Sequence, residues 1–379
     1  MSLKKLVIIS HTEHRIGEDG LIYGWGPTVE EINYLSSFFE YVAHVACIEK
    51  SSVIPGSYRR YNNDNIEYLP IPQFGGKTVL KKFLILFKAI NIIKQVEKAL
   101  DNATHVQLRV PMGIAIFLIP YFAIRKKKFI FWIKYANNWG DPNPKLGFRI
   151  QRYLLKKNIV KCKVTVNGIW PNQPDHIISF ENPCLYKGEI LNLGKVKIIN
   201  KHTQPFKLLF VGRVEEEKGV GIVIDWIVKY KPQEISVFTI IGEGKDYDYY
   251  HKYVKQIGLE DKIKFLGSKS REELQKLYVE YDMLVLPSFA SEGFPKVVAE
   301  AMAFGCVPIV SEVSSLKKFL EKSSAAISWS DFSENGLCDL LITDQLLTNG
   351  LDWAEKFTFE NYLNRLRSEV FVNKMSVNE

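Results

Sequence analysis

SEGFPKVVAEAMAFGCVPIV (residues 291–310) predicts a short turn followed by a helix that is apolar on nearly every side. Glu300 lies in the middle of that helix, and Glu292 stands just before it. A buried carboxylate that finds no hydrogen-bond donor is costly, so Glu300 must lie against a group that donates to it. The stretch ends in VPIV, which is typical of a buried strand.

Compact apolar runs alternate with helical patterns on both sides of this stretch. Strands are predicted at KKLVIIS (4–10), VAHVACI (42–48), THVQLRV (104–110), KKFIFWIKYA (127–136), PFKLLFVG (205–212), EISVFTIIGEG (234–244), IKFLGS (263–268), MLVLPS (283–288) and VPIVSEV (307–313), the last of the series. Helices are predicted over 28–41, where Pro27 suits the first turn, and over 81–100, while 14–27 is predicted as a glycine-rich loop. Such alternation indicates two doubly wound α/β domains with parallel sheets.

The composition is that of a globular protein long enough for two domains, with 379 residues, 46% hydrophobic and 24% charged. Five scattered cysteines argue against a disulfide framework or a zinc site and favour the cytoplasm. The apolar run at the N-terminus is too short for a signal peptide. The longest apolar run, 110–124, is interrupted by Pro111, Gly113 and Pro120, and predicts a buried core element.

Positive charge is concentrated in the first half. Residues 1–200 hold 28 Lys and Arg against 15 Asp and Glu, a balance of +13, whereas the whole chain carries +8. An anionic partner is therefore expected for this half. The basic stretches at 81–94 and 125–132 are either core elements with solvated lysines or sites of peripheral attachment to anionic lipid, and the charge balance favours attachment.

Two cations follow a strand end in LLFVGRVEEEKG (208–219). Arg213 comes directly after Gly212, and Lys218 lies just before the next helix. A guanidinium and an ammonium at the carboxyl edge of a parallel sheet suit a diphosphate. The alternative is that both pair with Glu215, Glu216 and Glu217 on a solvated loop.

The helix after Pro295 offers a second binding feature. Its first N–H groups favour negative charge or sugar oxygens. Glu300 lies five residues beyond Pro295, about 7.5 Å along the helix, so Glu292 and Glu300 would meet different parts of one ligand. The alternative is that Glu300 pairs with a core Arg or Lys while Glu292 is merely exposed.

Taken in order, GRVEEEKG, IIGEG, FLGS and VLPSFASEGFPKVVAEAMAFGCVPIV resemble the donor-binding half of retaining GT-B glycosyltransferases, specifically glycosyltransferase family 4 with its Glu-x7-Glu spacing. The resemblance is strong over about 205–312 and weaker before it. It implies an α/β GT-B fold of two Rossmann-like domains facing a cleft. The domains are expected at 1–195 for the acceptor and 196–355 for the donor, with a C-terminal helix at 356–379 returning to the first.

The resemblance also implies roles for matching residues. Arg213 and Lys218 would neutralise the donor diphosphate, Glu292 would bind the transferred sugar, and Glu300 would bind ribose hydroxyls. Backbone around Gly293, Phe294 and Pro295 would contact the sugar, and Gly242 and Gly244 would let the chain pass close to the nucleotide. Gly24 and Gly26 resemble a glycine loop that approaches the phosphates, with an ordinary βα loop as the alternative.

The first half departs from the family pattern. A histidine found in many relatives is replaced by the Tyr135–Asn138 stretch, where Asn137 or Lys134 is the candidate substitute. Arg109 and His11 are further candidates for acceptor or cleft contacts, while His105 is better explained as a core histidine. The Asp246–Asp248 pair matches a metal signature of another glycosyltransferase fold, yet it opens a predicted helix, and His11 and His14 lack further ligands; no metal or cofactor is expected.

The resulting prediction is a retaining, metal-independent, hexosyltransferase-type enzyme. It would move a sugar from a nucleotide sugar to a glycan or polyprenyl-linked acceptor, in envelope polysaccharide synthesis. We expect it in the cytoplasm, with peripheral contact to the inner face of the plasma membrane and no nucleic-acid partner. The alternatives are a GT-B relative that hydrolyses or epimerises a nucleotide sugar and a non-catalytic nucleotide-sugar-binding protein.

Overall fold

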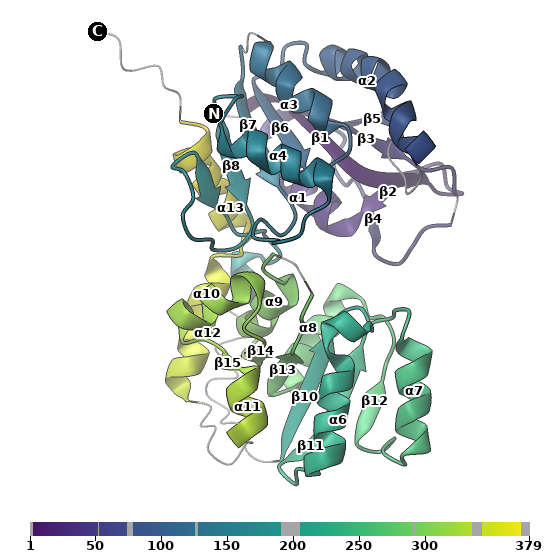
Figure 1. Cartoon of the computed structure of the whole chain (residues 1–379), viewed down its shortest axis with the longest axis vertical. Coiled ribbons are helices and arrows are strands. Elements are labelled where there is room, and N and C mark those ends of the chain that lie inside the picture. Colours follow the sequence, from purple (N-terminus) through teal and green to yellow (C-terminus); the bar gives the residue numbers. More distant parts are fainter. Residues whose placement is uncertain are drawn as a thin grey trace. The chain divides into compact units, whose positions relative to one another are not determined.

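The computed structural model describes residues 3–51, 53–73, 79–125, 128–190, 205–290, 293–335 and 343–372. The chain forms two compact units (Figure 1). Unit 1 comprises Met1–Asn167, Pro171–Phe180 and Leu363–Glu379, and unit 2 comprises Gly168–Trp170 and Glu181–Tyr362. The domain boundary expected at 195/196 falls within 191–204, outside the described residues, and stays a prediction.

Unit 1 contains a sheet in which β5, β3, β1, β6, β7, β8 and β9 run parallel in that order. Two short antiparallel strands, β2 and β4, extend the far end of β1. The bounds are β1 Leu3–Ile16, β2 Ile22–Trp25, β3 Phe39–Ile48, β4 Tyr58–Arg60, β5 Ile66–Pro72, β6 His105–Val110, β7 Ile130–Tyr135, β8 Lys163–Val166 and β9 Ile177–Ser179. The strand order reverses between β1 and β6, which is where such sheets bind ligands.

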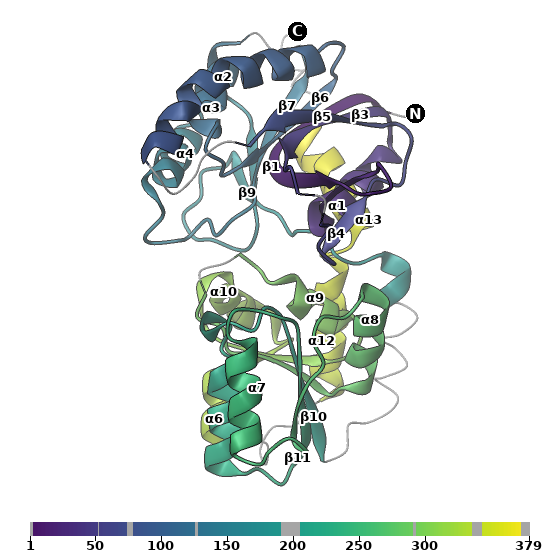
Figure 2. The same ribbon diagram turned by 90° about the vertical axis from the view of Figure 1, so that its right-hand side faces the viewer.

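Helices cover both faces of this sheet. α2 (Val79–Ala99), α3 (Ala115–Ile124) and α4 (Leu146–Lys156) lie together on one face (Figure 2). α1 (Gly26–Ser36) and the chain end after α13 (Phe359–Arg365) cover the other, where Phe371 contacts the rings of Phe39, His105 and Trp132. A π-helical turn, Leu366–Val370, leads to Phe371.

Two local predictions for unit 1 were wrong. The glycine-rich segment 14–27 is a hairpin, because β1 continues to Ile16 and pairs antiparallel with β2. The helix predicted to reach residue 41 ends at Ser36, because Phe39 is buried in β3 and pairs with Leu3. Pro27 does lie in the first turn of α1.

Unit 2 contains a parallel sheet in the order β12-β11-β10-β13-β14-β15. The strands are β10 Phe206–Val211, β11 Ile235–Ile241, β12 Ile263–Phe265, β13 Met283–Leu286, β14 Val307–Val310 and β15 Ile327–Ser328. The helices are α6 Val220–Tyr230, α7 Tyr247–Gln256, α8 Arg271–Glu280, α9 Lys296–Ala303, α10 Ser314–Ser323, α11 Trp329–Asn335 and α12 Asp344–Glu355. This order reverses between β10 and β13, as in a Rossmann fold.

The two parallel sheets with their covering helices confirm the predicted α/β fold class. The strand series does not end at residue 313 as expected, since β15 follows β14. The apolar run 110–124 folds into core as predicted, with Leu118, Ile119 and Phe122 fully buried in α3. Among the described residues, no helix is long and apolar enough to span a membrane.

Candidate functional site

The loops that follow β10 and β13 are joined at the point where the strand order of unit 2 reverses. The carbonyl oxygen of Glu217 accepts hydrogen bonds from Ser288 Oγ at 3.1 Å, Phe289 N at 3.0 Å and Ala290 N at 3.1 Å. A Cβ on Gly219, whose φ is +81°, would lie 2.4 Å from the carbonyl oxygen of Pro287. The loop that carries Arg213 and Lys218 is thereby fastened to the segment that leads into α9.

Gly242 and Gly244 are required by packing within unit 2 itself. A Cβ on Gly242, whose φ is +130°, would lie 1.9 Å from the carbonyl oxygen of Gly212. A Cβ on Gly244 would lie 2.3 Å from the carbonyl oxygen of Val214. The loops after β10 and β11 therefore touch backbone to backbone, and a role in approaching a nucleotide stays a prediction.

Arg213 pairs locally in the way the alternative interpretation described. Its guanidinium lies 3.0 Å from a carboxylate oxygen of Glu215 and 4.0 Å from one of Glu217, and 66% of its side chain is exposed. Lys218 is half-buried at the end of the 3₁₀ turn Glu216–Lys218. An exposed ion pair contributes about 0–1 kcal/mol, so a diphosphate can displace the Glu215 carboxylate at little cost.

Asp246 holds this loop, a role that the sequence did not reveal. Its carboxylate accepts a hydrogen bond from the Glu216 N–H at 2.8 Å, and its own N–H donates to the Val214 carbonyl at 3.1 Å. Asp246 stands at the N-terminal boundary of α7, and Asp248 is exposed in the first turn. Within the described ranges, no cluster of three or more metal-ligating side chains occurs.

The helix that opened the sequence argument begins at Lys296, with Pro295 as its N-cap residue. Pro295 has no N–H, so the donors expected around it come from Gly293, Phe294 and the helix itself. The ring of Phe294 is core, stacked on Phe357 at 4.6 Å and edge-on to Phe319 at 5.1 Å between ring centroids. Glu292 lies outside the described residues, and its predicted contact with a sugar stays a prediction.

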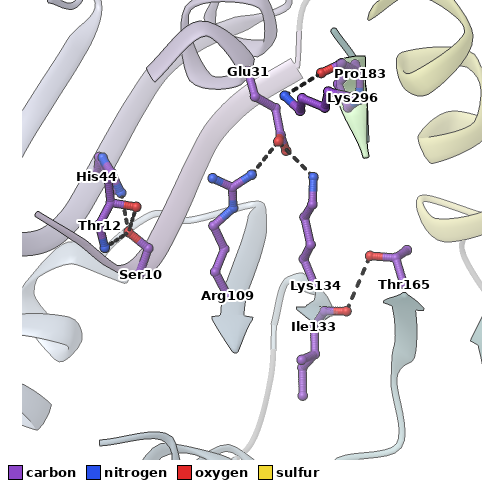
Figure 3. A network of polar contacts seen from close by, with 10 residues as sticks. All are labelled: Ser10, Thr12, Glu31, His44, Arg109, Ile133, Lys134, Thr165, Pro183 and Lys296. Carbon is purple, nitrogen blue, oxygen red and sulfur yellow. Dashed lines mark hydrogen bonds and ion pairs between the residues drawn. The ribbon is translucent and has the colours of Figure 1, made fainter. Parts of the chain in front are cut away.

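The Lys296 ammonium donates to the carbonyl oxygen of Pro183 at 2.8 Å (Figure 3). Glu300 is half-buried, and the Tyr278 hydroxyl donates to its carboxylate at 3.2 Å. Burial, followed by the nearby Glu300 charge, raises the pKa of Tyr278 well above its usual value, so Tyr278 stays a donor. Tyr278 is therefore a donor to Glu300 from the protein itself, and the contact of Glu300 with a ribose stays a prediction.

In unit 1, Arg109 is held by a buried ion pair. Its guanidinium contacts the Glu31 carboxylate, to which Lys134 Nζ also donates at 2.7 Å (Figure 3). Arg109 and Lys134 lie near the carboxyl ends of β6 and β7, and Glu31 comes from α1. The three side chains are at most 8% exposed. Arg109 and Lys134, both candidates for substrate contact, thus share one carboxylate from α1.

The other candidates of unit 1 lie apart from this ion pair. His11 and Asn137 are exposed, and the Asn137 side chain accepts from the N–H of Asn138 at 2.8 Å. A Cβ on Gly26 would lie 2.6 Å from the carbonyl oxygen of Ser57, so Gly26 is also packed closely against neighbouring backbone. His105 lies at the amino end of β6 against Phe39 and Phe371, which is the core role favoured from the sequence.

His14 belongs to a buried hydrogen-bonded chain rather than to a metal site. Its Nδ1 lies 2.9 Å from the Thr12 carbonyl, which only accepts, so Nδ1 carries the proton. Burial lowers the pKa of His14 to about 4, so the ring is neutral and Nε2 accepts from the Tyr61 hydroxyl at 2.8 Å. Tyr61 then accepts from His44 Nδ1 at 2.6 Å, and His44 Nε2 accepts from Ser10 at 2.8 Å. Alternation between donors and acceptors fixes both tautomers.

Comparison with known proteins agrees with this architecture. Residues 195–330 match the family described as glycosyl transferases group 1. An uncharacterized glycosyltransferase of Methanocaldococcus jannaschii is 30% identical over 212 residues, which are 53% of this chain and 51% of that protein. The amylovoran biosynthesis glycosyltransferase AmsK of Erwinia amylovora is 34% identical over 124 residues, 31% of this chain and 30% of that protein. The chain thus spans about half or less of the length of these relatives.

Likeness to solved structures concerns the fold. Anabaena HepE, solved in complex with UDP and glucose, superimposes with a TM-score of 0.63 at 13% identity, over 96% of this chain and 98% of that one. The two Rossmann-like units are therefore those of a GT-B fold, and the match to glycosyl transferases group 1 covers residues 195–330.

Proposed function

We propose that the chain is a retaining glycosyltransferase of family 4 that acts without a metal ion. It transfers a hexose from a nucleoside diphosphate sugar to a hydroxyl of a glycan or polyprenyl-linked acceptor in polysaccharide synthesis. The observation that carries the proposal is the pair of fastened loops at the switch point of unit 2, one of which bears Arg213 and Lys218. The amylovoran role of one relative and the UDP and glucose bound to HepE support it.

The chemistry requires positive charge beside the leaving group. The acceptor oxygen bonds to the anomeric carbon, the bond from that carbon to the diphosphate breaks, and the acceptor proton passes to the diphosphate. Arg213 and Lys218 stabilise the negative charge that develops there. Glu292 orients the transferred sugar, Glu300 binds the ribose, and backbone near Gly26, Gly242, Gly244 and Gly293 contacts the donor.

The partners follow from the same proposal. The acceptor and its lipid carrier are met by unit 1, whose Arg109, His11 and Asn137 are the candidate contacts. Its basic balance fits peripheral contact with the anionic inner face of a plasma membrane. The proposal includes a cytoplasmic location and no nucleic-acid partner.

A thermal-shift screen with UDP-, GDP- and ADP-sugars identifies the donor, and a transfer assay with that donor follows. Arg213→Ala and Lys218→Ala should each lower kcat on the order of 10²-fold, because each removes a cation from the charge that develops on the diphosphate. Lys264→Ala, an exposed lysine on β12, is the matched control and should transfer normally. Transfer in EDTA tests independence from metal ions.

Two outcomes of these assays would favour a different function. Donor consumption that needs no acceptor indicates hydrolysis or epimerisation, and donor binding without consumption indicates a binding protein. Near-normal transfer by both cation variants would remove Arg213 and Lys218 from the mechanism.

A further inference from the structure

The outward face of α4 consists of apolar and basic side chains. Its exposed positions follow one side of the helix from the N-cap to the C-cap residue: Lys145, Leu146, Arg149, Ile150, Tyr153, Lys156 and Lys157. Leu146 is 63% exposed, Tyr153 60% and Ile150 38%. Gln151 and Leu155 are buried on the opposite side, so the helix is packed on the unit while this apolar stripe stays uncovered.

The charged residues in the sequence around α4 are all basic. Residues 142–174 contain seven Lys and Arg and no Asp or Glu. By contrast, α7 and α8, each of ten residues, carry Asp248, Glu272 and Glu273 on exposed positions. Soluble helices keep both signs of charge on their outer faces, so the face of α4 is matched to a partner that is both anionic and apolar.

α3 is the helix that neighbours α4. α3 lies beside α4 in both views (Figures 1 and 2), and Gly147 of α4 backs onto Ile116 of α3. Ile124, the last residue of α3, is 85% exposed, and Arg125 follows it. Arg125 pairs with Glu97 at 2.8 Å, so the end of α3 offers an exposed apolar side chain rather than a free cation.

The stretches 81–94 and 125–132, which suggested lipid attachment from the sequence, differ from α4 in the burial of their apolar residues. In α2 from Lys88 onward, Ile92 and Val96 are fully buried, while Ile90 is 62% exposed and the outward positions also include Glu97. Phe131 and Trp132, from the second stretch, are buried in β7. Among the described residues of these stretches, Ile92, Phe131 and Trp132 therefore belong to the core, whereas the apolar residues on the outward face of α4 point away from it.

We propose that the α4 face docks on an anionic phospholipid surface. Leu146 and Ile150 enter the boundary between head groups and acyl chains, and Tyr153, with its apolar ring and polar hydroxyl, lies at that boundary. Lys145, Arg149, Lys156 and Lys157 contact the lipid phosphates. This inference deepens the membrane contact proposed above but does not depend on sugar transfer, because vesicle binding is measured without donor or acceptor.

Co-sedimentation of the full chain with vesicles tests this docking. The wild type should bind vesicles of phosphatidylcholine with phosphatidylglycerol, lose that binding in high salt, and bind pure phosphatidylcholine weakly. Lys145→Gln with Arg149→Gln should lower partitioning on the order of tenfold, because each basic residue near an anionic surface contributes substantially. Leu146→Gln with Ile150→Gln should lower it to a similar extent by removing the inserted groups.

Lys252→Gln with Lys255→Gln on exposed positions of α7 removes the same charge elsewhere and should leave binding unchanged. Thermal melting checks that every variant is folded. The proposal is overturned if the wild type ignores anionic vesicles, if the α7 variant loses as much binding as the α4 variants, or if the apolar variant binds like the wild type. Transfer activity in solution that is unchanged in the α4 variants separates this outcome from failure of the proposed function.

Discussion

Burial distinguishes the ion pair of Arg213 with Glu215 from that of Arg109 with Glu31. Arg213 pairs with Glu215 while two-thirds of its side chain remains in water, so the pair contributes little and exchanges easily for a ligand. Arg109 pairs with Glu31 out of water, where loss of one partner leaves a costly charge. The same residue types therefore form an exposed, exchangeable pair in unit 2, as the proposed diphosphate site requires, and a buried ion pair in unit 1.

Asp246 is expected to act as a positioning residue for the diphosphate. In Asp246→Ala the Glu216 N–H loses its charged acceptor, so the loop with Arg213 and Lys218 loosens. The affinity for the nucleoside diphosphate identified in the screen should fall on the order of tenfold. Affinity for the bare nucleoside should not change, because in the proposed site the loop meets only the phosphates. Calorimetry measures both affinities.

Two variants serve as controls for this prediction. Asp246→Asn keeps an acceptor oxygen and should recover most of the affinity, whereas Asp248→Ala should bind like the wild type. Equal losses in Asp246→Ala and Asp248→Ala would instead point to a shared metal site, and an equal loss for the nucleoside would point to general damage.

At the scale of elements, Glu31 ties α1 to β6 and β7. Glu31→Ala leaves the buried cations of Arg109 and Lys134 without their shared carboxylate, and the free energy of unfolding should fall by about 3–5 kcal/mol. Glu30→Ala, one residue away, is the matched control. Urea titration measures both, and similar stability in the two variants would contradict the tie.

A triple variant distinguishes structure from function in the same cluster. Glu31→Leu with Arg109→Met and Lys134→Met replaces the ion pairs by apolar contacts and should regain most of the lost stability. If that variant folds but no longer binds acceptor, Arg109 or Lys134 has a functional role as well. Full activity would show that the cluster of Glu31, Arg109 and Lys134 has only a structural role.

The elements predicted from sequence are those whose signal is local. Strands such as β10 and β11 are compact apolar runs with glycine at the end, so pattern alone located them. The hairpin of β1 and β2 was missed because Gly24 packs against His14, and that contact exists only in the folded chain. The sequence assigned no role to Glu31 and no loop contact to Asp246 for the same reason: their partners lie 78 and 30 residues away.

At the scale of the whole molecule, the described histidines that are buried, His14, His44 and His105, all lie in unit 1. Burial lowers the pKa of His14 and His105 to about 4 each. Burial, together with His14 and Arg109, lowers the pKa of His44 well below its usual value. These side chains are neutral in the folded chain near pH 5, whereas in the unfolded chain they gain a proton below about pH 6.5.

Unit 1 should therefore lose stability on acidification before unit 2 does. For His14 and His105 the contribution is complete above about pH 6.5 and is lost toward pH 4, at about 1.4 kcal/mol per pH unit while the unfolded chain alone binds the proton. His44 adds a loss in the same direction. Urea titrations at pH 7 and pH 5, each followed by a hydrogen-exchange pulse at one fixed pH, report the midpoints of peptides from both units. The unit 1 midpoint should fall further, and parallel shifts in the two units would show that these histidines do not set the acid response.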